Sequence, residues 1–469
     1  MKEKRFKEKN TKRNFAIASK LCITMIHLII VGCVWFLYYN ARAFRTHQVQ
    51  GGIVALFVYY IIYDSLARLY RAYKVGQYSI GEVIFSQVLS FGIADLIIYV
   101  EGCLIANKYI AIMPGILAVA VQVGMTILWA VFAKRYYMQH VPAPTTVVIY
   151  GKTDYVIFCN KLEKKFQHLF QIDKVVSADL DLTDLMKIID EEEIVILYRI
   201  GYRRKKDLMR YCVDKRINFY ITPTVPDIIT SGFENRHMID TPLLKYRNDK
   251  ETLGRRFIKR VMDIVISFLG IIVTLPFTIL TAVAIKMEDG GNIFFKQERY
   301  TKDWKKFNIL KFRSMVMDAE KDGAQLCKEH DDRITKVGAV IRRFRIDEIP
   351  QLINVLIGDM SIVGPRPERV ENMEKYTEEL PQFGYRLRVK GGLTGYAQLY
   401  GKYNTSASDK LKLDLMYIEN QSFLMDLKLI MLTLKVLFIP ESTEGFSEER
   451  AKTMQEKTRS YSKKIKGVS

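Results

Sequence analysis

Two adjacent acidic residues, Asp347 and Glu348, lie in the part of the chain that is richest in groups able to handle phosphate. Arg342 and Arg345 come just before them, and Arg366 follows in the same stretch. Guanidinium groups lower the pKa of a nearby carboxyl group and also bind phosphate esters. Neighbouring residues on a helix point in different directions, so the two acids do not form a flat acid/base pair across one bond. One attacking acid and one metal-binding acid fit this spacing better.

A magnesium ion is the metal that such a pair would hold. Diphosphate substrates normally arrive with Mg²⁺, whose octahedral oxygen shell is completed by one or two carboxylates and phosphate oxygens. We therefore expect Asp347 and Glu348 to bind Mg²⁺. Spacing alone favours a simpler interpretation, in which a solvated acidic pair forms salt bridges with the neighbouring arginines.

Further cationic groups come from other segments of the same region. Lys311 and Arg313 stand in a Lys-Phe-Arg-Ser-Met run, and Arg366 lies between two prolines that restrict the backbone around it. Phosphoryl transfer needs several such cations to neutralise the phosphate oxygens. Asp414 lies in an amphipathic run that could close the pocket.

The elements that must position these residues begin with apolar segments. The chain has 469 residues, of which 49% are hydrophobic, and a formal net charge of +20. Four runs, at 21–39, 51–67, 83–106 and 109–133, are long enough to cross a hydrocarbon core of about 30 Å. Basic residues flank these runs, as expected beside anionic lipid head groups. No zinc-finger spacing or RNP-like motif is present, so a nucleic-acid partner is not expected.

The remaining sequence divides into three parts. Residues 145–245 alternate short β-branched runs with helical stretches, which predicts a Rossmann-like α/β domain, although the Gly-x-Gly-x-x-Gly fingerprint is absent. Residues 252–440 form a mixed α/β catalytic domain. It starts with an apolar run at 264–285 that Pro276 should kink, and basic residues flank both ends of this run. The charged tail 441–469 is expected to be partly disordered or to lie on the surface.

Residues 252–440 closely resemble the bacterial sugar transferase family, the polyprenyl-phosphate hexose-1-phosphate transferases. The resemblance rests on motifs in family order: Lys-Phe-Arg-Ser-Met at 311–315, Asp-Glu-x-Pro-Gln-Leu at 347–352, Gly-Asp-Met-Ser at 358–361 and Gly-Pro-Arg-Pro at 364–367. The N-terminal helices, expected as a four-helix membrane domain at 1–141, and the middle domain resemble the large members. The implied fold is thus a membrane helical bundle, an α/β middle domain and a membrane-associated catalytic domain.

The resemblance implies a reaction and a place for it. Asp347 would attack the β-phosphate of a UDP-sugar, release UMP and carry the phosphosugar until polyprenyl (undecaprenyl) phosphate accepts it, which starts exopolysaccharide or capsule synthesis. Glu348 would help to hold Mg²⁺. Arg342 and Arg366 would bind phosphate oxygens, with Lys311, Arg313 and Asp414 as further pocket members. The 264–285 helix would be a re-entrant element on the inner leaflet of the bacterial cytoplasmic membrane, with the catalytic domain in the cytoplasm.

Two departures and two alternatives accompany this interpretation. Thr301 and Trp304 stand where members often have glycines, and Leu275 precedes Pro276 where small members often have serine, with Thr274 as a substitute hydroxyl. A direct glycosyltransferase would release UDP instead of UMP. A membrane-bound, nucleotide-sensing assembly protein without catalysis would explain the charge but not the motifs. The helices and middle domain offer enough surface for a homodimer, and the sugar cannot be read from the sequence.

Overall fold

Long apolar helices make up the N-terminal part of the computed structural model. They are α1 (Lys2–Val34), which continues into the π-helical turn η1 (Trp35–Tyr39), α3 (Val49–Leu69), α4 (Ile80–Ala106) and α5 (Met113–His140). Each is long and apolar enough to cross a membrane, which confirms a helix at each of the four predicted runs. The first three helices begin before their runs, whereas α5 begins at Met113, inside the run predicted at 109–133. Ser79 and Glu82 form a capping box that starts α4.

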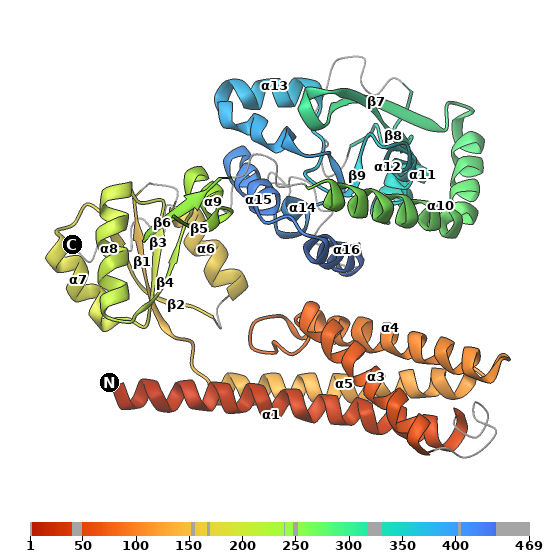
Figure 1. Cartoon of the computed structure of the whole chain (residues 1–469), viewed down its shortest axis with the longest axis horizontal. Coiled ribbons are helices and arrows are strands. Elements are labelled where there is room, and N and C mark those ends of the chain that lie inside the picture. The colour runs from red at the N-terminus through yellow and green to blue at the C-terminus, as the bar shows by residue number, and fades with distance from the viewer. Residues whose placement is uncertain are drawn as a thin grey trace. The chain divides into compact units, whose positions relative to one another are not determined.

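The structure describes residues 2–39, 49–151, 155–166, 169–238, 240–246, 252–317, 331–401 and 405–437. The predicted tail 441–469 lies outside these residues. Contacts divide the chain after Thr222 into two units, and each unit is considered by itself (Figure 1).

A parallel four-stranded sheet follows the helices in the first unit. Its strands are β1 (Thr145–Tyr150), β2 (Gln171–Ser177), β3 (Ile194–Tyr198) and β4 (Asn218–Ile221), in the order β2-β1-β3-β4. Successive side chains of β1 point to opposite faces of the sheet. Val147 packs with α7 (Leu182–Glu191) and α8 (Tyr202–Asp214), whereas Val148 packs with α6 (Tyr155–Phe166). The predicted α/β layer is therefore present, with helices on both faces.

The second unit starts earlier than the sequence predicted. Helix α9 (Val225–Ser231) contributes Ile228 to the core of the C-terminal unit, and the hairpin β5 (Glu234–Met238) and β6 (Thr241–Lys245) follows it. The predicted middle domain ran to residue 245, whereas the contacts place residues from Pro223 onward in the second unit. The apolar residues of α9 are too few for their spacing to show that this helix packs against the C-terminal core.

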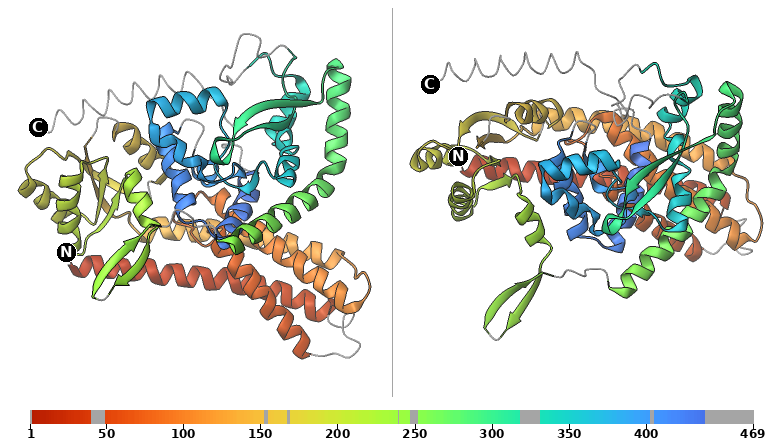
Figure 2. Two further views of the ribbon diagram at one scale, coloured as in Figure 1. Left: turned by 45° about the horizontal axis from the view of Figure 1, so that its top comes forward. Right: turned by 90° about the horizontal axis from the view of Figure 1, so that it is seen from above.

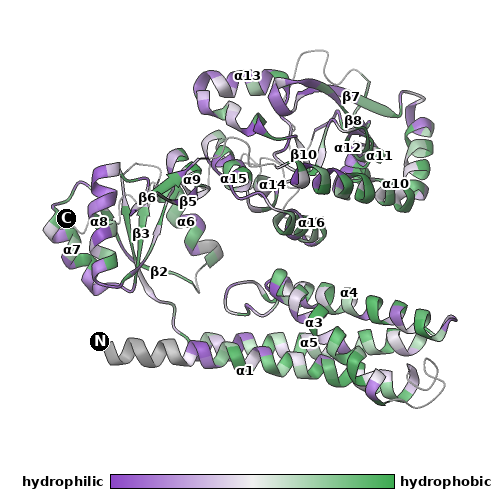
Figure 3. Ribbon diagram, viewed as in Figure 1, coloured by the Kyte–Doolittle hydropathy of each residue, from purple (hydrophilic) through white to green (hydrophobic). Residues whose placement is uncertain are grey.

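The longest helix, α10 (Leu253–Asp289), contains the predicted apolar run and Pro276. Its ribbon changes direction within its length (Figures 1 and 2), and proline is the ordinary cause of such a bend. Pro276 has no amide hydrogen to donate to the carbonyl of Ile272. The hydroxyl of Thr274 does not replace it, because it donates to the carbonyl of Gly270 at 2.7 Å. Helix α10 is predominantly hydrophobic, as is α16 (Phe423–Leu437) (Figure 3).

The remaining elements pack around two hydrophobic clusters, a large one and a smaller one formed by Ile285, Phe312 and Ile341. An antiparallel pair, β7 (Phe294–Tyr300) and β8 (Lys306–Phe312), precedes the short parallel pair β9 (Ser361–Val363) and β10 (Gly392–Thr394). The helical elements are α11 (Lys336–Arg343), η3 (Ile346–Glu348), α12 (Gln351–Ile357), α13 (Val370–Glu379), η4 (Pro381–Arg388), α14 (Tyr396–Tyr400) and α15 (Ala407–Glu419). Val355, Met360, Phe383 and Leu415 are fully buried where these elements meet.

Close packing at the start of α11 yields a stability prediction. A Cβ atom added at Gly338 would lie 2.0 Å from the carbonyl oxygen of Ser314, whereas one added at Gly254 would meet nothing within 4 Å. Gly338→Ala should therefore lower stability by about 1–3 kcal/mol, and the control Gly254→Ala should be neutral or slightly stabilising. Thermal unfolding of the purified protein in detergent measures both. An unchanged unfolding temperature for Gly338→Ala would contradict the packing described.

Candidate active site

Local hydrogen bonds place the acid pair against strand β8. Thr335 caps the start of α11, because its hydroxyl accepts a hydrogen bond from the amide of Gly338. The helix ends just before the turn η3 that carries both acids. Arg345, the residue before η3, has a φ of 58°, a strained value for a residue other than glycine. Asn354 of α12 bonds the backbone of Leu310 and Asn308 at 2.9 Å each. These contacts fix β8 beside η3.

Glu348 is the centre of a compact ion cluster. Its Oε1 atom lies 3.0 Å from Lys311 Nζ and 2.5 Å from Arg366 Nη2, and its Oε2 atom lies 3.4 Å from Arg366 Nη1. Burial alone would raise the pKa of Glu348, but Arg366 and Lys311 hold it well below its usual range. Glu348 therefore stays ionised, with both oxygens engaged.

Asp347 has the opposite environment in the same turn. Within the residues that the structure describes, no side chain or backbone group donates a hydrogen bond to its carboxylate. Burial and the charge of Glu348 raise its pKa, against the opposing effects of Lys311, Arg342 and Arg366. The arginines thus lower the pKa of both acids, as expected, but for Asp347 burial and the charge of Glu348 outweigh this effect.

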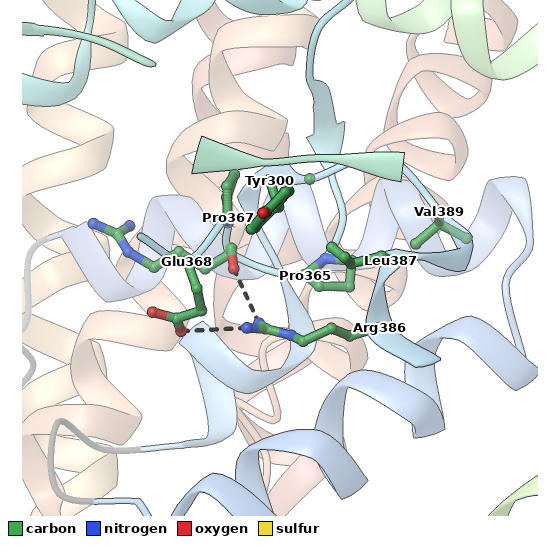
Figure 4. A pocket seen from close by; sticks show the side chains of 9 residues that line it. Tyr300, Pro365, Pro367, Glu368, Arg386, Leu387 and Val389 are labelled. Carbon is green, nitrogen blue, oxygen red and sulfur yellow. Dashed lines mark hydrogen bonds and ion pairs between the residues drawn. The ribbon is translucent and has the colours of Figure 1, made fainter. Parts of the chain in front are cut away.

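Two buried arginines hold the loop that carries Arg366. Arg386 Nη2 donates to the carbonyl of Arg366 at 2.9 Å, and Arg299 Nη1 donates to the carbonyl of Pro367 at 3.0 Å. Burial, with nearby Arg366, lowers the pKa of Arg299 to about 10, so Arg299 still carries its charge at neutral pH. A small hollow lined by Tyr300, Pro365 and Arg386 opens beside this loop (Figure 4).

Asp414 lies behind this loop. Its Oδ2 atom lies 2.7 Å from Arg386 Nη2, and both side chains are almost fully buried. Arg386 also pairs with Glu368 at 3.3 Å, and Lys410 pairs with the same carboxylate (Figure 4). Arg386, Lys410 and Arg299 together lower the pKa of Glu368 to about 2 in spite of its burial. Asp414 was predicted as a pocket member. Among the described residues it pairs with Arg386, which in turn binds the carbonyl of Arg366 at the acid cluster.

The other predicted cations divide between two places. Lys311 and Arg366 meet at Glu348, and the charge of Arg342 acts on Asp347. Arg313 instead forms two hydrogen bonds with Asp289 at the end of α10, one of them from Nη1 at 2.8 Å. The structure therefore brings three of the predicted cations close to Asp347 or Glu348 and ties Arg313 to α10.

Sequence reasoning missed the residues that support Arg366. Arg386 is one of 71 Lys and Arg residues and belongs to no motif that sets it apart. Thr301, which the sequence marks only as a departure from the family, connects two loops: its hydroxyl donates to the carbonyl of Asp359 at 2.9 Å and accepts from the amide of Gly391 at 3.2 Å. Trp304, which stands where family members often have glycine, has a φ of 59°, a conformation that glycine adopts without strain.

The donor set at η3 suits a magnesium ion. Among the described residues no group of three or more His, Cys, Asp or Glu side chains could hold a metal ion, so a site built from protein ligands alone is absent there. Asp347 offers a carboxylate with no hydrogen-bond donor, next to Glu348. Mg²⁺ commonly takes one or two carboxylates and completes its shell with phosphate and water, which matches this pair.

Comparison with known proteins finds matches for the part of the chain that carries this site. The family described as bacterial sugar transferase matches residues 254–440. A UDP-N-acetylgalactosamine-undecaprenyl-phosphate N-acetylgalactosaminephosphotransferase of Aeromonas hydrophila is 42% identical over 39% of this chain and 44% of its own length. A UDP-glucose:undecaprenyl-phosphate glucose-1-phosphate transferase of Escherichia coli strain K12 is 37% identical over 45% of this chain and 47% of its own length.

A smaller relative is matched along almost its whole length. The exopolysaccharide production protein PSS of Rhizobium leguminosarum is 36% identical over 40% of this chain and 96% of its own length. The chain therefore belongs to the bacterial sugar transferase family. The matches to the two larger relatives span less than half of each of those proteins.

The buried Arg386–Asp414 pair generates a second prediction. Arg386→Leu leaves Asp414 as a buried carboxylate without its ion-pair partner and removes one of the two ion-pair partners of Glu368, and breaking such a buried pair costs about 3–5 kcal/mol. Arg386→Leu combined with Asp414→Leu should be less destabilising than the two single losses added together. Thermal unfolding of the three variants tests this. Additive losses would mean that the two side chains stabilise the fold independently.

Proposed function

We propose that this protein transfers a hexose 1-phosphate from a UDP-sugar to undecaprenyl phosphate through a phosphosugar covalently bound to Asp347. The proposal rests on the different environments of the two acids in η3. Glu348 is saturated by Arg366 and Lys311, whereas Asp347 lies beside it with a carboxylate that no described residue binds. A nucleophile needs such a free oxygen, and the cations beside it suit the phosphate oxygens of the substrate.

The first step forms a bond between a carboxylate oxygen of Asp347 and the β-phosphorus. The bond between that phosphorus and the bridging oxygen breaks, and UMP leaves with the electron pair. An oxygen of undecaprenyl phosphate then attacks the same phosphorus, which frees the carboxylate and forms the lipid diphosphate sugar. Covalent catalysis of this kind divides one transfer into two displacements. The names of the relatives above support the donor and acceptor classes.

The surrounding residues have separate tasks in this proposal. When substrate binds, Arg366 and Lys311 shift from Glu348 to the phosphate oxygens, or interact with Glu348 and the phosphate together. Arg342 contributes a further positive charge close to Asp347. Asp347 would hold Mg²⁺, joined by Glu348 once Arg366 and Lys311 have shifted to the phosphate, and the ion would supply further neutralisation of the diphosphate. Arg386 and Asp414, which lie behind Arg366, hold its backbone and thereby its guanidinium in place without contacting substrate.

The lipid acceptor requires a site at a membrane, and α10 is the element that we propose to provide it. Phe257, Phe268, Val273 and Leu280 of α10 are all at least half exposed to the surroundings, and α16 exposes Leu424 in the same way. Basic residues lie in the first turns of α10, before its bent apolar part, and Lys286 lies near its end. Such a helix would enter and leave one leaflet, here the cytoplasmic leaflet of the bacterial inner membrane. Exopolysaccharide or capsule synthesis is the pathway class that would consume the product.

Replacement of the nucleophile provides the first test of activity. Asp347→Asn keeps the shape of the side chain but removes the attacking charge, so release of UMP should fall by at least about a thousandfold. The assay uses membranes or nanodiscs with undecaprenyl phosphate and a panel of UDP-sugars, and it separates UMP from UDP. Glu298→Gln, a change at an exposed carboxylate paired with Lys306, is the matched control and should retain activity. UDP as the released nucleotide would indicate a direct glycosyltransferase.

The pH dependence of the reaction should reveal the raised pKa of Asp347. Activity needs the ionised carboxylate, so kcat/KM should fall as the pH drops through a pKa above the usual 3.8. Glu348→Gln removes a negative neighbour and should move this acid limb to lower pH, whereas Lys311→Met removes a cation and should move it to higher pH. The residual activity of each variant is measured across the same pH range. Shifts in one common direction would contradict the assigned charges.

A further inference from the structure

Strand β9 has a second edge that no strand covers. On one edge it pairs with β10, where the amide of Ser361 donates to Gly391 and the amide of Gly364 donates to Thr394, each at 2.9 Å. Within the described part of the chain, the sheet that contains them consists of these two strands. Buried amide and carbonyl groups on the other edge of β9 still need partners.

Side chains of α10 supply those partners. Asp263 Oδ1 accepts from the amide of Ile362 at 2.9 Å and from the hydroxyl of Ser361 at 3.0 Å. Lys259 Nζ donates to the carbonyl of Val363 at 3.1 Å. Residues four apart lie on one face of a helix. This face of α10 therefore bonds β9 as a neighbouring strand would, with a carboxylate in place of a carbonyl and an ammonium in place of an amide.

The two side chains are themselves held in place. Asp263 is 4% exposed, and Lys259 Nζ lies 2.8 Å from Asp426 Oδ2, at the start of α16. The hydroxyl of Tyr417 donates to the other oxygen of Asp426 at 2.7 Å. The charge of Lys259 is thus balanced within the protein, and its position is tied to two further helices.

A short and stiff stretch of chain connects this contact to the acid cluster. Val363 is followed by Gly364, Pro365 and Arg366. A Cβ atom at Gly364 would lie 2.4 Å from the carbonyl oxygen of Lys390, and the carbonyl of Pro365 accepts from the amide of Gly392 at 2.8 Å. Since the proline also fixes its own φ, a shift of β9 must move the backbone of Arg366.

We propose that Asp263 and Lys259 are positioning residues, through which the apolar helix α10 completes β9 and holds Arg366 at Glu348. The same half of α10 exposes Phe257, Val265 and Phe268 on its outer side. One helix therefore both meets lipid and fixes the phosphate-binding arginine. The consequence for transfer rests on the function proposed above, whereas the mechanical link does not.

Kinetics of the full-length enzyme in nanodiscs tests the link to catalysis. Asp263→Ala should lower kcat by about tenfold or more, because small misplacements of catalytic groups are costly. Asp263→Asn keeps an acceptor for the amide of Ile362 and should retain most of the activity. Ser267→Ala is the matched control. Ser267 is also buried in α10, and among the described residues its hydroxyl bonds only to carbonyls of that helix.

A double-mutant cycle distinguishes positioning from a general loss of structure. If Asp263 acts through Arg366, Asp263→Ala should cost no more than about twofold in an Arg366→Lys background. Losses that multiply, or an Asp263→Asn variant as slow as Asp263→Ala, would overturn the proposal.

Hydrogen exchange tests the mechanical link without any activity. In Asp263→Ala, the amides of residues 362–366 should exchange faster than in the wild type and in Ser267→Ala, while those of α13 should be unchanged. Unaltered exchange at 362–366 would overturn the proposal even if the enzyme were active. Faster exchange at 362–366 in Asp263→Ala, together with a wild-type protein that transfers no sugar phosphate, would preserve the link and reject only the proposed function.

Discussion

The pairing of Glu348 with Arg366 and Lys311 is the interaction on which the rest of the site depends. Two adjacent carboxylates in a half-buried turn repel each other, and the cations resolve this conflict unequally. Glu348 receives both partners and stays ionised, whereas burial and the charge of Glu348 raise the pKa of Asp347, which has no hydrogen-bond donor among the described residues. A carboxylate of that kind is a better nucleophile than one that is already neutralised.

Much of the C-terminal unit holds Arg366 in place. Arg386 and Arg299 bind the carbonyls of the loop that carries it, and Asp414 and Glu368 balance the charge of Arg386 in the interior. Buried ion pairs of this kind contribute little net stability, because desolvation offsets their attraction. Their value here is geometric: they fix a guanidinium beside the acid pair. Helix α10 takes part in the same support through Asp263 and Lys259.

Strong local patterns made the architecture predictable, whereas contacts between distant segments did not. The apolar runs and the alternating strands of 145–221 gave the helices and the parallel sheet, and the motif order gave the family. Asp347, Glu348, Lys311 and Arg366 were predicted together because they stand in motifs. The role of Arg386 was not, because a buried arginine has the same letter as an exposed one. The pairing of Arg313 with Asp289 and the packing of Ile228 against the C-terminal core likewise depend on long-range contacts that sequence spacing does not encode.

The most direct measurement is the mass of the peptide that contains Asp347. Full-length enzyme in nanodiscs without undecaprenyl phosphate is mixed with its UDP-sugar, quenched with acid and digested. We predict an added mass equal to one hexose phosphate on Asp347, formed together with a stoichiometric amount of UMP and lost when undecaprenyl phosphate is supplied. An enzyme that turns over normally and never carries this adduct would contradict the account.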